Sequence, residues 1–312
     1  MACDDAEKQN EAGILTNGRV RGHIMASYGI EKGFHSLRPQ RTLRIPMKYC
    51  RFEISGRSNY GLIEPLAGRD TITRTLTTPP EQAAGELEDL PSKRIQAIAL
   101  EEAELLAPVW PSKIVCVGRN YREHAAELGN EVPTEPLIFL KPPSSILAPG
   151  SSIRRPRISE RTDYEGELGV VIGKLCRKLQ ADEDVHPFIL GYTCVNDFTA
   201  RDLQNKDDQW TRAKGFDTFC PVGPLVSNEI DPWVGVRVET RVNGALRQEG
   251  NTRDFIFPLE VLIRYISQVM TLLPGDLIAT GTPKGVGPVV AGDVIEVEVT
   301  GIGTLRNGVV DE

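Results

Sequence analysis

The chain has 312 residues, of which 40% are hydrophobic and 25% are charged, as in an ordinary globular protein. Its net charge of −7 argues against a nucleic-acid-binding surface as its main function. No apolar run approaches the length that spans a membrane, and the N-terminus lacks the basic-then-apolar order of a signal peptide. We therefore expect a cytoplasmic protein that binds neither nucleic acid nor a membrane.

The cysteines agree with that location. None of the six belongs to a Cys-x-x-Cys pair, and Cys116 and Cys194 lie in apolar, strand-like runs, where cysteine is usually a small buried hydrophobic residue. We expect reduced thiols, and neither a thiolate metal site nor a catalytic thiol.

The first 106 residues divide into two parts. Residues 1–46 are polar, basic in places and without a clear period, which predicts a disordered or loosely attached extension. A strand that begins at Met47 makes that residue a possible start site. Residues 47–106 predict a small N-terminal α/β domain, with strands at 47–54 and 60–63 and a helix at 79–90.

Strands dominate the remaining domain, residues 107–312, after a linker marked by Pro108 and Pro111. Asn243-Gly244 is the strongest two-residue signal for a hairpin and joins two of these strands. One long helix is predicted at 258–270, because Pro258 lies in its first turn and apolar residues recur at helical spacing. The strands are expected at 113–117, 137–140, 163–172, 190–196, 236–242, 245–249, 276–279 and 294–299.

The strand at 163–172 carries two carboxylates, Glu165 and Glu167, beside an apolar run. Side chains two residues apart on a strand point the same way, with Cα atoms roughly 6.5 Å apart. Two like charges in an apolar setting are costly unless a cation neutralises them, and oxygen ligands suit a hard cation. An edge strand with both side chains in solvent explains the pattern equally well.

Asp197 directly follows the strand at 190–196 and precedes a helical turn expected at 198–204. Taken singly, an aspartate in that place is more simply a helix N-cap. Taken together with Glu165 and Glu167, it predicts a three-carboxylate metal site for Mg²⁺, Mn²⁺ or Ca²⁺.

His124 lies in a segment, 120–128, whose composition favours a helix that ends at Gly129. Glu127 is three residues further on, so the two side chains meet on one helical face. A glutamate that holds an imidazole raises its basicity, as deprotonation of a water requires. From spacing alone, an exposed helical ion pair is the more probable interpretation.

Two further segments have both a functional and a plain structural interpretation. The glycine-rich run from Gly281 to Pro288 lacks the ending of a phosphate-binding loop. It can present Thr282 and backbone N–H groups to a carboxylate, but it is more simply a turn between strands. Lys214 would ordinarily be a surface lysine.

From Lys113 to the C-terminus, about two thirds of the chain, the sequence resembles the fumarylacetoacetate hydrolase family. Each motif is weak alone, and the specific feature is that all occur in the family's order. The motifs are Gly118-Arg119-Asn120-Tyr121 with His124 and Glu127; Glu165-Gly-Glu167-Leu-Gly; Asn196-Asp197 with Thr199-Ala-Arg201-Asp202-Leu-Gln204; Lys214-Gly-Phe; Val242-Asn-Gly; and Gly281-Thr282-Pro283-Lys284-Gly285-Val-Gly.

The resemblance implies an α+β, predominantly β fold: a mixed β-sandwich roll with few helices, usually in a homodimer, after the small N-terminal domain of bacterial members. It also implies a role for each matching residue. Glu165, Glu167 and Asp197 match the family's ligands for Mg²⁺ or Mn²⁺, with Ca²⁺ in some members. His124, Glu127 and Lys214 match catalytic positions, the first two on a lid over the substrate. Substrate contacts are implied for Arg119, Tyr121, Arg201, Gln204 and Thr282.

The implied chemistry begins with a 2-oxo acid held by a divalent metal ion, which stabilises an enolate. Our first hypothesis is hydrolysis of a carbon–carbon bond in acylpyruvate-like 2,4-dioxo acids. The alternative is an isomerase or decarboxylase of 2-oxo diacids, such as 2-hydroxyhepta-2,4-dienedioate or oxaloacetate, in aromatic-compound catabolism. A metal-stabilised binding protein without turnover is the hypothesis from a different class.

Overall fold

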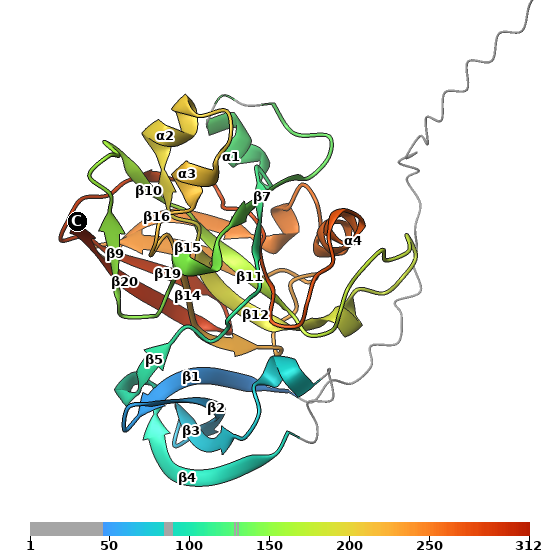
Figure 1. Ribbon diagram of the computed structural model, residues 1–312, viewed down its shortest axis with the longest axis vertical. Coiled ribbons are helices and arrows are strands. Elements are labelled where there is room, and N and C mark those ends of the chain that lie inside the picture. Colours follow the sequence, from blue (N-terminus) through green and yellow to red (C-terminus); the bar gives the residue numbers. More distant parts are fainter. Residues whose placement is uncertain (1–45, 84–89, 128, 130) are drawn as a thin grey trace, which may run out of the picture. The chain divides into compact units, whose positions relative to one another are not determined.

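The computed structural model describes residues 46–83, 90–127, 129 and 131–312 (Figure 1). The extension predicted at 1–46 therefore lies outside the described residues except for Pro46, and so does half of the helix predicted at 79–90, residues 84–89. The strands before residue 107 are β1 (Lys48–Ile54), β2 (Arg57–Leu66), β3 (Arg69–Leu76), β4 (Ser92–Ala99) and β5 (Glu104–Leu106), with 3-10 helices η1 (Pro80–Ala83) and η3 (Leu100–Glu102).

These N-terminal elements confirm the strand predicted at 47–54, and the one predicted at 60–63 is part of the longer β2. The described residues before 107 contain no α-helix, so the α/β character of this region is not confirmed. The boundary between residues 106 and 107 stays a prediction.

A 12-stranded sheet contains these strands together with strands from the rest of the chain. Its central order is β4-β3-β2-β1-β14-β12-β11-β17-β6-β7, and antiparallel pairing of Lys48 with Ser227 connects β1 to β14. Its later strands are β6 (Ile114–Gly118), β7 (Leu137–Lys141), β8 (Ile146–Leu147), β11 (Gly166–Ile172), β12 (Ile189–Asn196), β14 (Cys220–Ser227) and β17 (Leu277–Ala279).

Two smaller sheets complete the strand structure. The five-stranded sheet contains the predicted hairpin, whose turn residues Asn243 and Gly244 have φ angles of 53° and 79°, as a two-residue turn of this kind requires. Its strands are β16 (Ala245–Asn251), β15 (Arg237–Val242), β19 (Val294–Val299), β20 (Gly303–Asp311) and β9 (Ser152–Arg155). The three-stranded sheet contains β13 (Thr199–Ala200), β10 (Thr162–Tyr164) and β18 (Gly287–Pro288).

The core lies where the large sheet meets the five-stranded sheet, since β11 contacts β15, β12 contacts β19 and β14 contacts β20. Every residue of β11, β12 and β14 is buried, so both faces of these strands are covered. Leu168 and Val170 belong to the main apolar cluster, whereas Val171 belongs to a second cluster on the opposite face. By strand alternation, Glu167 lies on the face of Val171.

Helices are few, and none in the described part of the chain is long and apolar enough to cross a membrane. The predicted helix at 258–270 is confirmed as α4, and its apolar residues Leu262, Ile263 and Ile266 are fully buried. The helices are α1 (Arg122–Glu127), α2 (Arg201–Lys206), α3 (Thr211–Lys214) and α4 (Leu259–Val269), with 3-10 helices η4 (Pro143–Ser145), η5 (His186–Phe188) and η6 (Thr252–Asp254).

Two predicted elements differ from the structure. The strand predicted at 163–172 is interrupted at Glu165, because β10 and β11 belong to different sheets. The helical turn predicted at 198–204 begins only at Arg201, because Thr199 and Ala200 form the short strand β13 instead. Cys116 and Cys194 are buried and free, as predicted.

Candidate active site

The chain changes sheets at Glu165, and this change positions the first carboxylate. The N–H of Glu165 donates to Asn196 Oδ1 at 3.0 Å, and its carbonyl accepts the N–H of Asp197 at 2.8 Å. Gly166 follows where no side chain fits, since a Cβ there would lie 2.0 Å from Thr240 Oγ1. The glycine between the two glutamates therefore lets β11 approach the five-stranded sheet closely.

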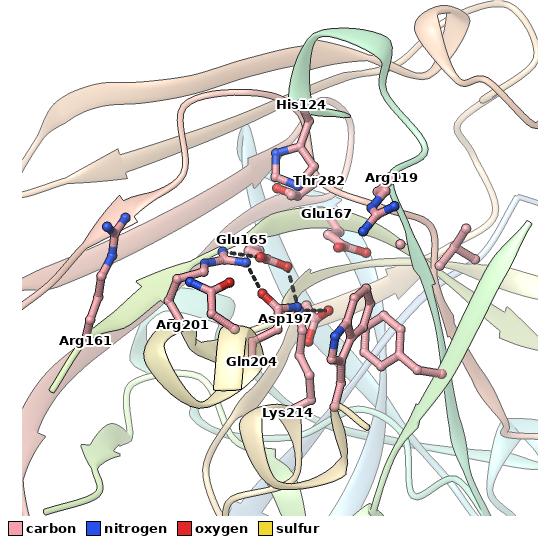
Figure 2. Close-up of a pocket in the computed structure, with 15 residues that line it drawn as sticks. Arg119, His124, Arg161, Glu165, Glu167, Asp197, Arg201, Gln204, Lys214 and Thr282 are labelled. Atoms are coloured by element: carbon pink, nitrogen blue, oxygen red, sulfur yellow. Dashed lines mark hydrogen bonds and ion pairs between the residues drawn. The ribbon is translucent and has the colours of Figure 1, made fainter. Parts of the chain in front are cut away.

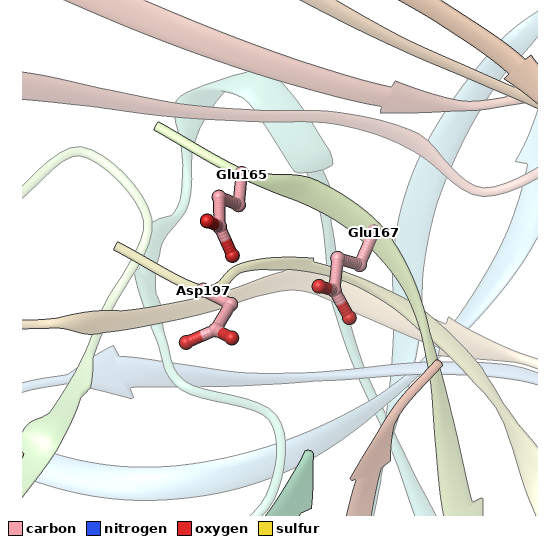
Figure 3. Close-up of side chains that lie close together, drawn as sticks. All are labelled: Glu165, Glu167 and Asp197. Carbon is pink, nitrogen blue, oxygen red and sulfur yellow. The ribbon is translucent and has the colours of Figure 1, made fainter. Parts of the chain in front are cut away.

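Glu165, Glu167 and Asp197 converge, and one carboxylate oxygen from each lies within 4.8 Å of the others (Figure 3). All three are buried, with exposed fractions of 5%, 2% and 1%. Burial excludes the solvent-exposed edge strand that the sequence left open. Asp197 is not a helix N-cap, because the N-cap residue of α2 is Ala200.

Three buried cations compensate two of these carboxylates. Lys214 Nζ lies 2.7 Å from both Glu165 Oε2 and Asp197 Oδ2, so it is a buried lysine rather than a surface one. Lys141 Nζ donates to Asp197 Oδ1 at 2.5 Å, and Arg201 Nη2 donates to Glu165 Oε1 at 2.5 Å. Burial raises the pKa of Glu165, but Lys214 and Arg201 outweigh it and hold that pKa well below its usual range.

Glu167 is compensated least. Its Oε2 accepts the N–H of Gly281 at 2.7 Å, and its other oxygen accepts no hydrogen bond from the described residues. Burial, with the nearby charges of Asp197 and Glu165, raises the pKa of Glu167 well above its usual range. At 4.8 Å and an effective dielectric constant of about 20, two carboxylates repel by roughly 3.5 kcal/mol.

This donor set fits a divalent cation. A doubly charged ion among three oxygen ligands removes the repulsion that would otherwise be relieved by a proton on Glu167. Carboxylate oxygens are the ligands that Mg²⁺, Mn²⁺ and Ca²⁺ prefer, and sulfur or nitrogen donors are absent from this cluster. The buried triad is therefore a candidate metal centre.

A fourth carboxylate, that of Asp163, holds Arg201 in place beside the triad. Asp163 is fully buried and accepts from Arg201 Nε at 2.9 Å and from Arg161 through two bonds of 2.9 and 3.1 Å. Arg201 Nη1 also donates to Gln204 Oε1 at 2.5 Å, one turn further along α2. Both predicted substrate contacts on α2, Arg201 and Gln204, are thus fixed before any ligand binds.

His124 and Glu127 lie on α1, as their spacing predicts, with Nδ1 of the imidazole 3.4 Å from Glu127 Oε2. The imidazole is 4% exposed, so the alternative of an exposed ion pair is wrong for this residue. Burial lowers the pKa of His124, which Glu165 and Glu127 only partly offset, so the ring is neutral near pH 7. Both carboxylate oxygens of Glu127 also accept the N–H of Gly285, at 3.0 and 3.1 Å.

The loop that begins at Gly281 is therefore more than a turn between strands. Its backbone N–H groups bind two carboxylates of the protein itself, that of Glu167 through Gly281 and that of Glu127 through Gly285. The hydroxyl of Thr282 donates to the carbonyl of Gly166 at 2.9 Å and accepts from Gln248 at 2.8 Å. Thr282 also lines the pocket, but its hydroxyl proton is already engaged with Gly166.

A cavity of about 340 Å³ joins these groups (Figure 2). Tyr121 and Glu127 do not line it. Tyr121 packs edge-on against Phe255, and its buried hydroxyl has no hydrogen-bond partner among the described residues. The predicted residues that do line the cavity are Arg119, His124, Glu165, Glu167, Asp197, Arg201, Gln204, Lys214 and Thr282.

Several residues of the site were not anticipated. Lys141 ends β7 and gives no local signal, because its partner Asp197 is 56 residues away. Arg161 and Asp163 precede Glu165 and Glu167 at the same two-residue spacing, so strand alternation could have indicated them. Phe139 and Trp210 form an apolar wall with ring centroids 5.2 Å apart, and Phe139 lies 5.0 Å from Lys214 Nζ.

Comparison with known proteins identifies the family of this chain. The family model described as fumarylacetoacetate (FAA) hydrolase C-terminal matches residues 113–310. That match covers the triad, the histidine and most of the described chain. The protein belongs to the fumarylacetoacetate hydrolase family.

Three similar proteins have the printed names of a tautomerase, a decarboxylase and an isomerase. Oxaloacetate tautomerase YisK of Bacillus subtilis is 44% identical over 223 residues, which are 67% of this chain and 74% of that protein. A mitochondrial oxaloacetate decarboxylase of Dictyostelium discoideum is 48% identical over 198 residues, 62% of this chain and 90% of that protein. Among solved structures, 2-hydroxyhepta-2,4-diene-1,7-dioate isomerase of Mycobacterium marinum is 40% identical with a TM-score of 0.74, covering 85% of this chain and 99% of that chain.

Proposed function

We propose that this protein is a metal-dependent isomerase or decarboxylase of 2-oxo diacids, with oxaloacetate and 2-hydroxyhepta-2,4-dienedioate as the candidate substrates. The three relatives named above support this choice over the hydrolysis of acylpyruvates that the sequence first suggested. Their printed names share one substrate class, a four- or seven-carbon 2-oxo diacid or its enol.

The observation that carries the proposal is the charge balance around the triad. Glu165, Glu167 and Asp197 contribute three negative charges, and the buried Lys141, Lys214 and Arg201 contribute three positive ones. With all three carboxylates ionised these six groups are neutral together, and Asp163 and Arg161 add one charge of each sign. A divalent ion and the lining Arg119 then leave the pocket with about three positive charges, so a dianionic substrate compensates more of this charge than a monoanion does.

Glu165, Glu167 and Asp197 are the residues that would hold the ion, which we take to be Mg²⁺ or Mn²⁺, with Ca²⁺ as a further candidate. When bound, such an ion supplies Lewis-acid stabilisation of negative charge on the 2-oxo oxygen. Lys214 adds to this from the protein side. Two of its three N–H donors engage Glu165 and Asp197, which leaves one donor for an oxygen of the substrate.

The proton steps belong to the His124–Glu127 pair. Neutral His124 removes a proton from C3 of the substrate, and the enol forms when the 2-oxo oxygen gains a proton, so isomerisation needs no water and no redox partner. Decarboxylation breaks the C3–C4 bond instead. Carbon dioxide leaves, the electron pair of the broken bond stays on the remaining fragment as an enolate, and C3 then takes a proton. Glu127 orients the imidazole through Nδ1 and leaves Nε2 without a partner among the described residues.

Hydrolysis of acylpyruvate-like 2,4-dioxo acids is the second candidate, because the same pair can draw a proton from a water molecule. The resulting hydroxide would attack the 4-oxo carbon and break the C3–C4 bond. The observation in its favour is the neutral, buried imidazole held by Glu127.

A substrate panel separates these reactions. The Mg²⁺-loaded protein is given oxaloacetate, 2-hydroxyhepta-2,4-dienedioate and acetylpyruvate, and the ultraviolet absorbance of the enol is followed with and without excess EDTA. We expect EDTA-sensitive turnover of one or both diacids. Cleavage of acetylpyruvate alone would favour the hydrolase, and full activity in EDTA would overturn metal dependence.

The proposal also includes assembly and location. We propose a homodimer in the cytoplasm, as the family resemblance implies, with a small-molecule 2-oxo acid as the ligand. Light scattering of the purified chain measures its mass in solution, and a monomer at all concentrations would contradict this part.

A further inference from the structure

Arg119 has an unusual backbone conformation at the edge of the pocket. It directly follows β6 and has a φ of 59°, a left-handed conformation that side-chain-bearing residues adopt only at a cost in free energy. The next residue fixes this conformation, because Asn120 donates to the carbonyl of Thr280 at 2.8 Å and accepts the N–H of Phe257 at 2.8 Å. The chain therefore maintains a strained arginine where glycine would be relaxed.

Arg119 also differs from the other cations of the pocket. Lys214, Arg201 and Arg161 each donate to a carboxylate of the protein. Arg119 donates no hydrogen bond and makes no ion pair with any of the described residues, although it is only partly exposed and lines the cavity. Among the lysine and arginine side chains of the described residues that line the pocket, only Arg119 thus has all of its donors available.

The position of Arg119 complements that of the arginines on the opposite side. Figure 2 shows its guanidinium near Glu167, whereas Arg161 and Arg201 lie across the pocket beyond Glu165. The aromatic side chains of Phe139 and Trp210 line the same pocket, and a Cβ on the preceding residue, Gly118, would be 3.3 Å from the Trp210 ring. An anionic group that reaches Arg119 is therefore partly withdrawn from water, which strengthens its bond to a guanidinium.

We propose that Arg119 binds the second carboxylate of the substrate and thereby selects 2-oxo diacids over 2-oxo monoacids. This inference rests on the proposed function, because it concerns which 2-oxo acid the same site accepts. A guanidinium offers two parallel N–H donors to a carboxylate. When the ligand has a methyl group in that place, the charge of Arg119 loses its partner and the desolvated donors stay unsatisfied.

Two ligands of matched shape test this assignment. Oxaloacetate and 2-oxobutanoate differ only in that a methyl group replaces the second carboxylate. Each is titrated into the Mg²⁺-loaded protein, and its dissociation constant is taken from the rise in melting temperature, which needs no turnover. We expect the wild-type protein to bind oxaloacetate about 10- to 100-fold more tightly.

In Arg119→Met we expect the affinity for oxaloacetate to fall about 10- to 100-fold. The affinity for 2-oxobutanoate should stay the same or rise, because that ligand has no group for Arg119 to bind and the variant leaves no desolvated donor unsatisfied. Arg119→Gly should show the same loss while its melting temperature without ligand is unchanged or higher, since glycine accepts the left-handed backbone. Arg119→Lys should retain part of the selectivity. Arg122→Met, which removes an exposed arginine on α1, is the matched control.

Several outcomes would overturn the assignment: no preference for oxaloacetate in the wild-type protein, equal losses for both ligands in Arg119→Met, or no loss for either. These results are distinguishable from failure of the proposed function. A wild-type protein that prefers oxaloacetate through Arg119 but turns over no diacid would refute the activity and keep the binding role. Turnover of oxaloacetate with unchanged selectivity in Arg119→Met would do the reverse.

Discussion

The two chemically important regions of the pocket are built in different ways. The triad region, which comprises Glu165, Glu167 and Asp197 with their cations, lies at the ends of β11 and β12, and its carboxylates are at most 5% exposed. The α1 region, residues 122–127, is a helix of six residues whose Glu127 side chain is 33% exposed. The first region is held by charge pairs inside the sheet, and the second by hydrogen bonds to one loop.

Because of this difference, we expect the same change of charge to have different consequences in the two regions. In the triad region a lost carboxylate leaves a buried cation with fewer partners, so stability and activity change together. In the α1 region the Glu127 carboxylate reaches water, so its neutralisation should change activity and leave stability nearly unchanged. The predictions below test that contrast, beginning with the largest effect.

Asp197→Asn should have the largest effect. Asp197 is the shared partner of Lys141 and Lys214, and both ammonium groups are almost fully buried. Loss of its charge should reduce kcat/KM by a factor of about 10³ or more. It should also lower the free energy of unfolding by about 3–5 kcal/mol, measured by urea denaturation. Asp217→Asn, at an exposed position, is the control, and a fully stable Asp197→Asn protein would contradict the charge pairing.

Glu167→Gln should reduce activity as much as Asp197→Asn does. Unlike Asp197→Asn, it should raise the free energy of unfolding of the metal-free protein. In the metal-free protein, burial together with repulsion from Asp197 and Glu165 raises the pKa of Glu167. We therefore expect the variant to be more stable than the wild type in EDTA by about 1–2 kcal/mol at pH 7 and to lose its stabilisation by Mg²⁺.

The pH dependence of stability follows from the same raised pKa. At pH values above 4.5, the ordinary pKa of a glutamic acid side chain, native Glu167 retains a proton that the unfolded chain has released. The metal-free wild type should therefore gain stability as the pH falls from neutrality toward about 4.5, and Glu167→Gln should not show this gain. Urea denaturation in EDTA at several pH values measures the effect, and parallel curves for the two proteins would contradict it.

The contrast between the regions also explains what the sequence could and could not predict. Glu165 and Glu167 are two residues apart on one strand, and His124 and Glu127 are three apart on one helix, so local periodicity was enough to pair them. Lys141 could not be found in this way, because it meets Asp197 only when β7 and β12 take their places in the sheet. Strand order is a property of the tertiary fold, which no short segment encodes.

The same reasoning applies to the fold. The hairpin at Asn243-Gly244 and helix α4 were predicted well because a turn signal and an apolar stripe determine them locally. The break at Glu165 was missed, since residues 163–172 alternate as one strand would, and only the two different sheets separate β10 from β11. Arg119 gave no sign of its left-handed backbone, which depends on the hydrogen bonds of Asn120 to distant segments.

His124→Gln tests the α1 region. We expect kcat to fall by about 10²- to 10⁴-fold, because the variant has no general base, while the free energy of unfolding changes by less than about 1 kcal/mol. In the wild type, kcat/KM should decrease at acid pH with an apparent pKa below the ordinary histidine value of 6.5, since burial disfavours the imidazolium ion. The measurement is the steady-state rate between about pH 4.5 and 8, a range that includes the ordinary pKa of histidine. An unchanged rate in His124→Gln would remove the imidazole from the mechanism.

Glu127→Gln should have the smallest effect. Its carboxylate contacts His124 at 3.4 Å and raises the pKa of that imidazole, so its neutralisation should shift the acid limb of the pH profile to lower pH. The rate should fall by only about 10-fold, because glutamine can still accept a hydrogen bond from Nδ1 and from Gly285. Glu123→Gln is the matched control on the same helix, since Glu123 pairs with Lys284 at an exposed position where the charge contributes little. An acid limb that moves to higher pH in Glu127→Gln would mean that Glu127 does not act on His124 through its charge, and the α1 region would then need another source of basicity.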